Sequence, residues 1–329
     1  MTLPKQQVIS VVAPGKLNLT FDILGKREDG YHDVATVLQT IDLVDTIVFA
    51  TDPKSDFSVE LLSADNGSSI AFPLDDTNLI CRACEAFNQF TGSAPGFSLR
   101  VLVKKVIPVG AGLAGGSADA AATLIALNTL TGKNLPLSQL QEIAKSLGSD
   151  VPFCLTGGTA LGLGRGDNVT PLATECNFHY VIVKPKQVSV STPWAYGLFD
   201  EQIAYRKDLQ SAKGRSESVF RMLENSSTED AQKEFGNDFE LIIFEQFGYL
   251  RKAKEALVGF GSLACHLTGS GPTIYALASD QAQAKRLAGH VKKLSFTVPS
   301  SDGLRNETVS FDAWVAKSLP HGARVVAAS

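Results

Sequence analysis

The chain has 329 residues, of which 44% are hydrophobic and 19% charged, and its net charge at pH 7 is −4. This composition is typical of a globular protein long enough for two domains or one large one. The charge predicts no basic surface for nucleic acid or anionic lipid, and no apolar run approaches the length of a membrane span. We therefore expect a protein that binds neither nucleic acid nor a membrane.

The cysteines suggest a reducing compartment. Their number is odd and they are dispersed, at Cys81, Cys84, Cys154, Cys176 and Cys265. Cys81 and Cys84 form one C-x-x-C without a second pair, which favours structural thiols over a metal or redox site. The first residues lack a basic start followed by a long apolar core, so no secretory signal is expected. Together these features favour a cytoplasmic location.

The first elements in chain order are strands. Residues 8–13 and 17–24 have strand composition, and in the second segment apolar and polar residues alternate. Lys16 and Asn18 therefore share the polar face, opposite the core face. The elements expected next are a turn over 27–33, a strand over 34–50, a helix over 77–92 that stops at Gly92, and a strand over 97–107.

A glycine-rich turn then leads directly into an alanine-rich helix. Residues 108–117, here named the glycine loop, contain Gly110, Gly112, Gly115 and Gly116, so successive backbone N–H groups can point into one hollow. Ser117 is interpreted as the N-cap of the helix. Free N–H groups and the helix dipole make such a helix start a site for an anion, most often a phosphate.

Two common phosphate loops fit the glycine loop poorly. Gly110, Gly112 and Gly115 match the dinucleotide fingerprint, but residues 129–141 supply no acidic residue for a ribose. A Walker loop requires G-x-x-x-x-G-K-[ST], which does not occur. The remaining alternative is a tight turn that only caps a buried helix.

The second half of the chain has a different character, beginning near Thr170. A helix over 138–148 precedes this point. The elements expected after it are a strand over 177–185, an aromatic turn-rich segment over 191–200, a polar and partly helical segment over 201–238, a helix over 249–261, a strand–turn–strand over 263–278 and a helix over 281–294. This mixed order favours an α+β fold in two lobes, divided into residues 1–170 and 171–329, over a doubly wound sheet.

Four segments could together perform phosphoryl transfer. The glycine loop would hold a di- or triphosphate, and the Ser117 hydroxyl could contact phosphate or magnesium. Asp150 could take the proton of an attacking alcohol, and Lys16 could hold charge beside it. Residues 268–273 form a second glycine turn. Asp119, near the start of the helix, would repel a phosphate and should therefore face metal or solvent.

Each residue also has a purely structural interpretation. Lys16 alone could be a solvated lysine, and Asp150 alone could be an N-cap for the helix that contains Pro152. The turn at 269–271 could be a simple hairpin, and Tyr31 could be a turn tyrosine packed on a sheet. The combination of all four segments favours the functional interpretation.

The combination resembles the GHMP small-molecule kinase superfamily. The shared pieces are residues 13–16, 108–121 and 267–273, and their order and spacing match over most of the chain. Within the superfamily, the similarity is strongest to members that phosphorylate 4-diphosphocytidyl-2-C-methyl-D-erythritol. The segments that resemble those members are 16–45, 148–153 and 236–240, and residues 164–167 resemble plant and cyanobacterial forms.

The resemblance implies a fold and an activity. The fold would be the two-domain GHMP kinase fold, with an N-terminal ATP-binding lobe of the ribosomal-protein type over 1–170, a C-terminal α/β-sandwich substrate-binding lobe over 171–329, and a cleft between them. The activity would be ATP- and Mg²⁺-dependent phosphorylation of the 2-hydroxyl of the cytidine compound, a step of the non-mevalonate route to isoprenoid precursors. The protein would be a monomer or homodimer.

The resemblance also implies site residues. Asp150 would be the general base, Lys16 the catalytic lysine, and Asn18 a contact of the methylerythritol. Those expected to bind ATP are Pro108, Val109, Gly110, Ala111, Gly112, Leu113, Ala114, Gly115, Gly116 and Ser117, with Asn78 and Lys104 or Lys105 near the adenosine. Ser117 would also be the magnesium ligand. The substrate residues would be Tyr31, His32 and Tyr196 around the cytosine, with Thr192, Gly269, Ser270 and Gly271.

Three other functions are weighed against this one. Another GHMP kinase, of the mevalonate, homoserine or galactose type, would share the glycine loop. It would not be expected to share the segment that contains Tyr31 and His32. A non-catalytic nucleotide-binding regulator would be expected to lack Lys16 or Asp150, and both are present. A nicotinamide-dependent oxidoreductase would need the missing ribose acid.

Overall fold

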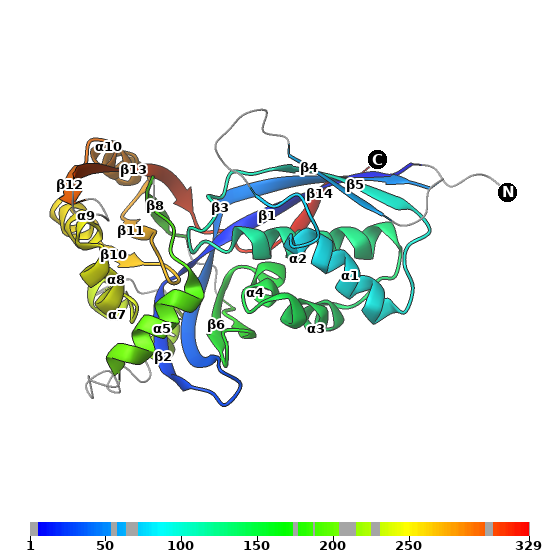
Figure 1. Ribbon diagram of the computed structural model, residues 1–329, viewed down its shortest axis with the longest axis horizontal. Coiled ribbons are helices and arrows are strands. Elements are labelled where there is room, and N and C mark those ends of the chain that lie inside the picture. The colour runs from blue at the N-terminus through cyan, green and yellow to red at the C-terminus, as the bar shows by residue number, and fades with distance from the viewer. Residues whose placement is uncertain are drawn as a thin grey trace.

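Two sheets, each flanked by helices, form the molecule (Figure 1). The computed structural model describes residues 6–53, 58–63, 72–173, 177–186, 188–203, 215–224, 231–299 and 305–328. Over these residues the architecture is the expected α+β arrangement in two lobes. No helix in the described ranges is long and apolar enough to cross a membrane.

The first sheet is built around one long strand, β3. Within the described residues it has nine strands: β1 (Val8–Asn18), β2 (Thr20–Lys26), β3 (His32–Asp52), β4 (Val59–Ser63), β5 (Ser98–Lys104), β6 (Thr159–Leu163), β7 (Asn168–Pro171), β9 (Gly236–Asn237) and β14 (Arg324–Ala328). β3 pairs antiparallel with β1, β2, β5 and β6. β3 therefore holds four strands in register with one another, and several of them carry or precede residues of the site described below.

Four helices gather on one face of this sheet (Figure 1). They are α1 (Leu79–Thr91), α2 (Gly115–Leu130), α3 (Leu137–Leu147) and α4 (Val151–Thr156). α2 is buried on nearly every side and has alanine at five buried positions, which lets the sheet and the other helices approach it closely. This packing fixes α2 from Ala118 onward, directly behind the glycine loop.

The second sheet builds the other lobe, and the described residues of the second half of the chain contain six helices. The strand order is β10 (Ala264–Leu267), β11 (Ile274–Ala278), β8 (His179–Pro185), β13 (Asn306–Lys317) and β12 (Ser295–Pro299). The helices are α5 (Thr192–Ile203), α6 (Arg215–Glu224), α7 (Ala231–Glu234), α8 (Glu240–Gln246), α9 (Gly248–Gly259) and α10 (Gln281–Val291). Two strands from late in the chain join the first sheet, since β9 pairs with β2 and β14 with β1. The division of the chain at residue 170 stays a prediction.

Most expected elements are confirmed. α1 begins after Asn78, whose side chain accepts a hydrogen bond from the Ile80 amide, and ends at Gly92 in the left-handed conformation. The expected break between 13 and 17 is wrong, because β1 continues through a bulge to Asn18. Residues 191–200 were expected to be turn-rich, but most of this segment belongs to α5. The expected polar segment lies partly outside the described residues, as does Cys176.

Candidate active site

One cavity of about 810 Å³ brings the expected site together. Of the predicted site residues, those lining it are Lys16, Tyr31, His32, Asn78, Lys105, Pro108, Val109, Gly110, Ala111, Gly112, Leu113, Ala114, Gly115, Gly116, Ser117, Asp150, Thr192, Tyr196, Gly269 and Ser270. Asn18, Lys104 and Gly271 are not among its lining residues. The cavity therefore extends from the glycine loop to the aromatic residues that sequence reasoning assigned to a base.

The glycine loop ends one turn earlier than predicted. Helix α2 begins at Gly115, and its N-cap is Ala114 in a left-handed conformation with φ 56°. Ser117 is therefore not the N-cap, because it already lies within the first helical turn. Ala114 has no side-chain acceptor to offer, so no side chain caps this helix start. The first-turn N–H groups thus remain suited to an external anion such as a phosphate.

The glycine loop packs directly against the second glycine turn. Gly112 has φ +73°, and a Cβ built on it would lie 2.6 Å from the backbone oxygen of Thr268. A Cβ on Gly269 would in turn lie 3.1 Å from the oxygen of Gly112. The two turns approach this closely only because neither residue has a side chain. The second turn is therefore part of the loop's support, and not an isolated hairpin.

A substitution at Gly112 tests this packing. We expect Gly112→Ala to lower the free energy of unfolding by about 2 kcal/mol or more, because the new methyl group meets a backbone carbonyl at positive φ. Gly116→Ala is the matched control, since its Cβ would make an ordinary 3.5 Å contact with Leu79 inside a helix. The control should be neutral or stabilising by up to about 1 kcal/mol. Chemical denaturation measures both, and equal effects would refute the close packing.

Lys16 and Asp150 meet in the cavity. The Lys16 ammonium lies 3.6 Å from Asp150 Oδ2, and the side chains are 4% and 38% exposed. Lys16 is thus buried and held, contrary to the interpretation as a solvated lysine. Asp150 precedes α4 as the N-cap residue, but its side chain makes no capping hydrogen bond. Its carboxylate is therefore available to the cavity.

Asn18 connects Lys16 to the second glycine turn. The Asn18 side-chain oxygen accepts from the Lys16 ammonium at 2.6 Å and from the Gly269 amide at 2.9 Å. Its amide nitrogen donates to Thr36 Oγ1 at 2.8 Å. Lys16 and Asn18 do share one face, as predicted, but both are buried. Contact between Asn18 and a substrate stays a prediction, while its role in orienting Lys16 follows from these bonds.

Lys105 belongs to a buried triad with Asp45 and Asp119. Its ammonium lies 2.6 Å from both carboxylates, and all three side chains are at most 4% exposed. Burial, together with the nearby charge of Asp45, raises the pKa of Asp119 to about 7 against the opposing charge of Lys105. Asp119 does not face solvent, because it is buried and one of its oxygens is bonded to Lys105; that its other oxygen faces a metal stays a prediction. Lys104, the alternative to Lys105, is exposed on β5.

Aromatic side chains line the other end of the cavity, and we name four of them the aromatic end: Tyr31, His32, Tyr196 and Phe239. Tyr196 stacks on His32 with ring centroids 4.4 Å apart and meets Phe239 edge-on at 4.9 Å. Burial and the charge of Asp150 raise the pKa of Tyr196. Tyr31 is 56% exposed and is not packed on the sheet as the structural interpretation required.

Sequence reasoning missed several residues of this end. Asp200 lies 2.6 Å from His32 Nε2 and 2.6 Å from the Lys26 ammonium. Arg165 lies over the Tyr31 ring at 5.0 Å from its centroid. Asp200 follows no local pattern that predicts a site, whereas Arg165 and Phe239 stand in the segments 164–167 and 236–240 that the resemblance had singled out.

Donors for a divalent cation are few near the glycine loop. No cluster of three or more His, Cys, Asp or Glu side chains suited to a metal occurs in the described part of the chain. The Ser117 hydroxyl lines the cavity, as does Asp119, whose Oδ1 is buried without a hydrogen-bond partner. This donor set fits a magnesium ion held mainly by the phosphates of a nucleotide, which is how Mg²⁺ is usually bound.

The chain matches two family models and relatives over most of its length. Residues 78–158 match the family model for the GHMP kinases N terminal domain, and residues 210–294 match that for GHMP kinases C terminal. A 4-diphosphocytidyl-2-C-methyl-D-erythritol kinase of Synechococcus sp. (strain JA-2-3B'a(2-13)) is 35% identical over 323 residues, which cover 96% of each chain. The enzyme of that name from Acaryochloris marina is 34% identical over 88% of this chain and 92% of its own.

Solved structures show the same architecture. A crystal structure of 4-(cytidine 5'-diphospho)-2C-methyl-D-erythritol kinase superposes with a TM-score of 0.71 at 26% identity, covering 94% of this chain and 99% of the other. A homoserine kinase from Cytophaga hutchinsonii also superposes with a TM-score of 0.71, at 21% identity and 97% coverage of each chain. At that identity the second likeness concerns the fold alone.

Proposed function

The chain belongs to the GHMP kinases, and from that premise we propose that it transfers the γ-phosphoryl group of ATP to the 2-hydroxyl of 4-diphosphocytidyl-2-C-methyl-D-erythritol. The observation that supports this most is the single cavity that contains both the glycine loop and the aromatic end. A nucleotide phosphate chain and a second, base-bearing substrate could occupy it together. The product would enter the non-mevalonate route to isoprenoid precursors.

Asp150 is the proposed general base. Its carboxylate lines the cavity and is partly exposed, so it can accept the proton of the attacking hydroxyl. The oxygen of that hydroxyl then forms the new bond to phosphorus as the bond to the ADP oxygen breaks. The Lys16 ammonium, 3.6 Å from Asp150 Oδ2, helps to orient this carboxylate.

Lys16 supplies positive charge beside the reacting groups. Because it is 4% exposed and bonded to Asn18, it loses little freedom when the substrates bind. Charge that is fixed before the reaction stabilises the transferring phosphoryl group without reorganisation. The first-turn N–H groups of α2 would act in the same way on the other phosphates of ATP.

A magnesium ion would be held by the nucleotide phosphates with the Ser117 hydroxyl and Asp119 Oδ1 as candidate protein ligands. When bound, it would neutralise charge on the phosphates of ATP. Asn78 and Lys105 line the wall beside the glycine loop and would face the adenosine side.

Tyr31 is proposed to stack on the cytosine. We expect Tyr31→Ala to raise the KM for the cytidine substrate by about tenfold and to leave the KM for ATP nearly unchanged, because base stacking on an aromatic ring contributes roughly 1–3 kcal/mol. Tyr31→Phe keeps the ring and should resemble the parent protein. Steady-state kinetics with each substrate varied in turn give both constants, and equal changes in the two KM values would make Tyr31 structural.

The reaction itself is tested by ADP release from Mg-ATP with a panel of acceptors. ADP formed with 4-diphosphocytidyl-2-C-methyl-D-erythritol, and not with mevalonate, homoserine or galactose, is the expected result. ADP formed with another acceptor would preserve the phosphate site and reject the cytosine pocket. ATP binding without ADP from any acceptor would instead favour a nucleotide-binding regulator.

A further inference from the structure

The segment 236–240 connects three walls of the cavity. Asn237 donates to the backbone oxygens of Leu267 at 3.1 Å and Gly269 at 2.8 Å, so it holds the second glycine turn. The Asp238 amide donates to the oxygen of Phe21 on β2 at 2.9 Å. Phe239, the next residue, belongs to the aromatic end. The position of this short segment therefore sets the position of the Phe239 ring.

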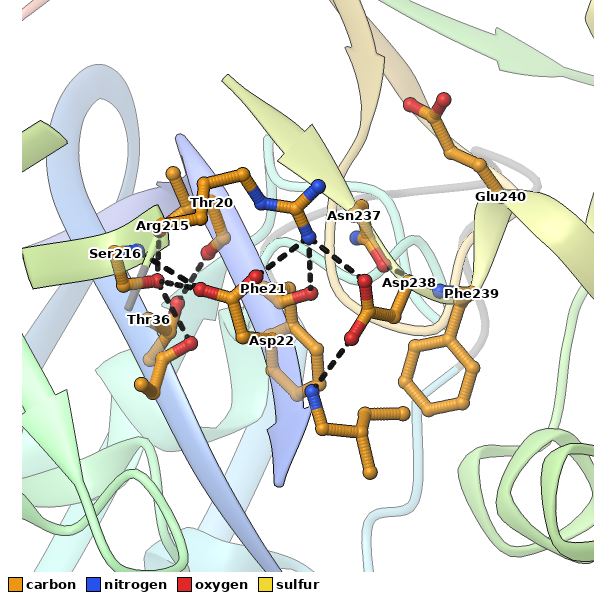
Figure 2. A network of polar contacts seen from close by, with 12 residues as sticks. Thr20, Phe21, Asp22, Thr36, Arg215, Ser216, Asn237, Asp238, Phe239 and Glu240 are labelled. Atoms are coloured by element: carbon orange, nitrogen blue, oxygen red, sulfur yellow. Dashed lines mark hydrogen bonds and ion pairs between the residues drawn. The ribbon is translucent and has the colours of Figure 1, made fainter. Parts of the chain in front are cut away.

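Arg215, outside the cavity lining, fixes this segment against β2 (Figure 2). Its Nη2 lies 2.6 Å from Asp22 Oδ1 and 2.7 Å from Asp238 Oδ1. Asp22 is fully buried and Asp238 nearly so. The second oxygen of Asp238 accepts from the amide of Ile23 at 2.8 Å. One guanidinium group thus joins two buried carboxylates on β2 and on the segment 236–240.

The close approach of Arg215 depends on a glycine. A Cβ built on Gly236 would lie 2.7 Å from Nη1 and 3.2 Å from Cζ of Arg215. Gly236 is not among the glycines with positive φ, so an alanine could adopt its backbone conformation. Its lack of a side chain is therefore required for the space that the guanidinium occupies. Such a residue can be used to displace Arg215 without changing any charge.

The effect of this contact reaches the aromatic end through ring packing. Phe239 lies between Phe21, at 5.5 Å, and Tyr196, at 4.9 Å. Tyr196 in turn stacks on His32 at 4.4 Å. Interiors packed in this way transmit small shifts, because each ring occupies the space left by its neighbours. A displaced Phe239 would therefore displace Tyr196.

We infer that Arg215 is a positioning residue for the cytidine end of the substrate, acting through Asp238 and Phe239 on Tyr196. The inference rests on the proposed function, since it concerns the base that the aromatic end would hold. Arg215 touches neither substrate. It sets the spacing of the rings, and thereby the affinity for the cytidine compound and not the affinity for ATP.

Gly236→Ala is the first test, because it preserves both carboxylates and the guanidinium. We expect the KM for the cytidine substrate to rise about tenfold and the KM for ATP to change by less than about twofold, as misplacement of a binding group by about 1 Å has large effects. Arg215→Met should show the same split. Arg221→Met is the matched control, because Arg221 lies on the same helix with a 68% exposed side chain. The control should leave both constants unchanged.

A double variant separates positioning from general loss of stability. In the Arg215→Met background, Gly236→Ala should add less than about twofold to the KM for the cytidine substrate, because the group it displaces is gone. Equal rises in both KM values, or full additivity, would overturn the inference. So would a lowered melting temperature with unchanged KM values.

Crystal structures of the Gly236→Ala variant and the parent protein provide a readout that needs no turnover. Displaced Phe239 and Tyr196 rings support the inference, and unmoved rings overturn it. Failure of the parent protein to use the cytidine substrate would refute the proposed function, and this outcome is distinct from either structural result.

Discussion

Asp150→Asn should lower kcat by about 10²–10⁴-fold while ATP still binds with nearly its original affinity. The amide has almost the shape of the carboxylate but cannot take the proton of the attacking hydroxyl. Because the Asp150 side chain makes no capping hydrogen bond to α4, its replacement should change the free energy of unfolding by no more than about 0.5 kcal/mol. Single-turnover kinetics and calorimetric titration with ATP measure the two effects.

Asp280→Ala provides the contrast for this prediction. Asp280 is the N-cap of α10, and its side chain accepts from the amide of Gln283. Its loss should cost about 1 kcal/mol of stability and leave kcat unchanged. The two variants thus separate a capping aspartate from a catalytic one. Unimpaired turnover by Asp150→Asn would remove Asp150 from the mechanism.

The largest effect on stability is expected from Lys105→Met. The substitution leaves Asp45 and Asp119 buried without their shared cation, which should lower the free energy of unfolding by about 3–5 kcal/mol. Lys104→Met changes the preceding, exposed residue and should have an effect within about 0.5 kcal/mol. Denaturation in urea measures both variants.

The pH dependence of the Lys105→Met effect has a definite sign. Burial and Asp45 already raise the pKa of Asp119 to about 7 in the presence of Lys105, and without that cation the pKa rises further. A carboxyl whose pKa is higher in the folded than in the unfolded state stabilises the fold at low pH, where it is protonated. This contribution is lost as the pH rises through the folded-state pKa, because the buried carboxyl must then ionise. The loss of stability should therefore be smaller at pH 5 than at pH 8. An equal loss at both values would contradict the buried triad.

Local signals in the sequence predicted much of the fold and the phosphate side of the site. Glycines at 110, 112, 115 and 116 indicate the turn, and the alanine-rich run after them indicates the helix. Both are local features, because the residues of the segment itself determine its backbone conformation. The alternation over 17–24 placed Lys16 and Asn18 on one face for the same reason. The N-cap was predicted wrongly, because Ala114 adopts the left-handed conformation, which glycine and asparagine adopt more readily than alanine.

Long-range contacts were not predictable in this way. Lys105 pairs with a carboxylate 60 residues earlier in the chain, and Arg215 with one 193 residues earlier. A lone lysine or arginine in the sequence indicates a solvated side chain, since burial depends on partners that only the fold supplies. Residues 191–200 were expected to be turn-rich because proline and glycine occur there, yet packing of Ala195 and Phe199 against the second core favours α5.

Phosphorus NMR of the reaction mixture tests the central claim most directly. With Mg-ATP and 4-diphosphocytidyl-2-C-methyl-D-erythritol, the account predicts one new phosphomonoester signal, coupled to the carbon that bears the 2-hydroxyl, that grows as ADP forms. The two signals of the cytidine diphosphate linkage should persist. Formation of inorganic phosphate alone, or a phosphomonoester at another carbon, would contradict the account.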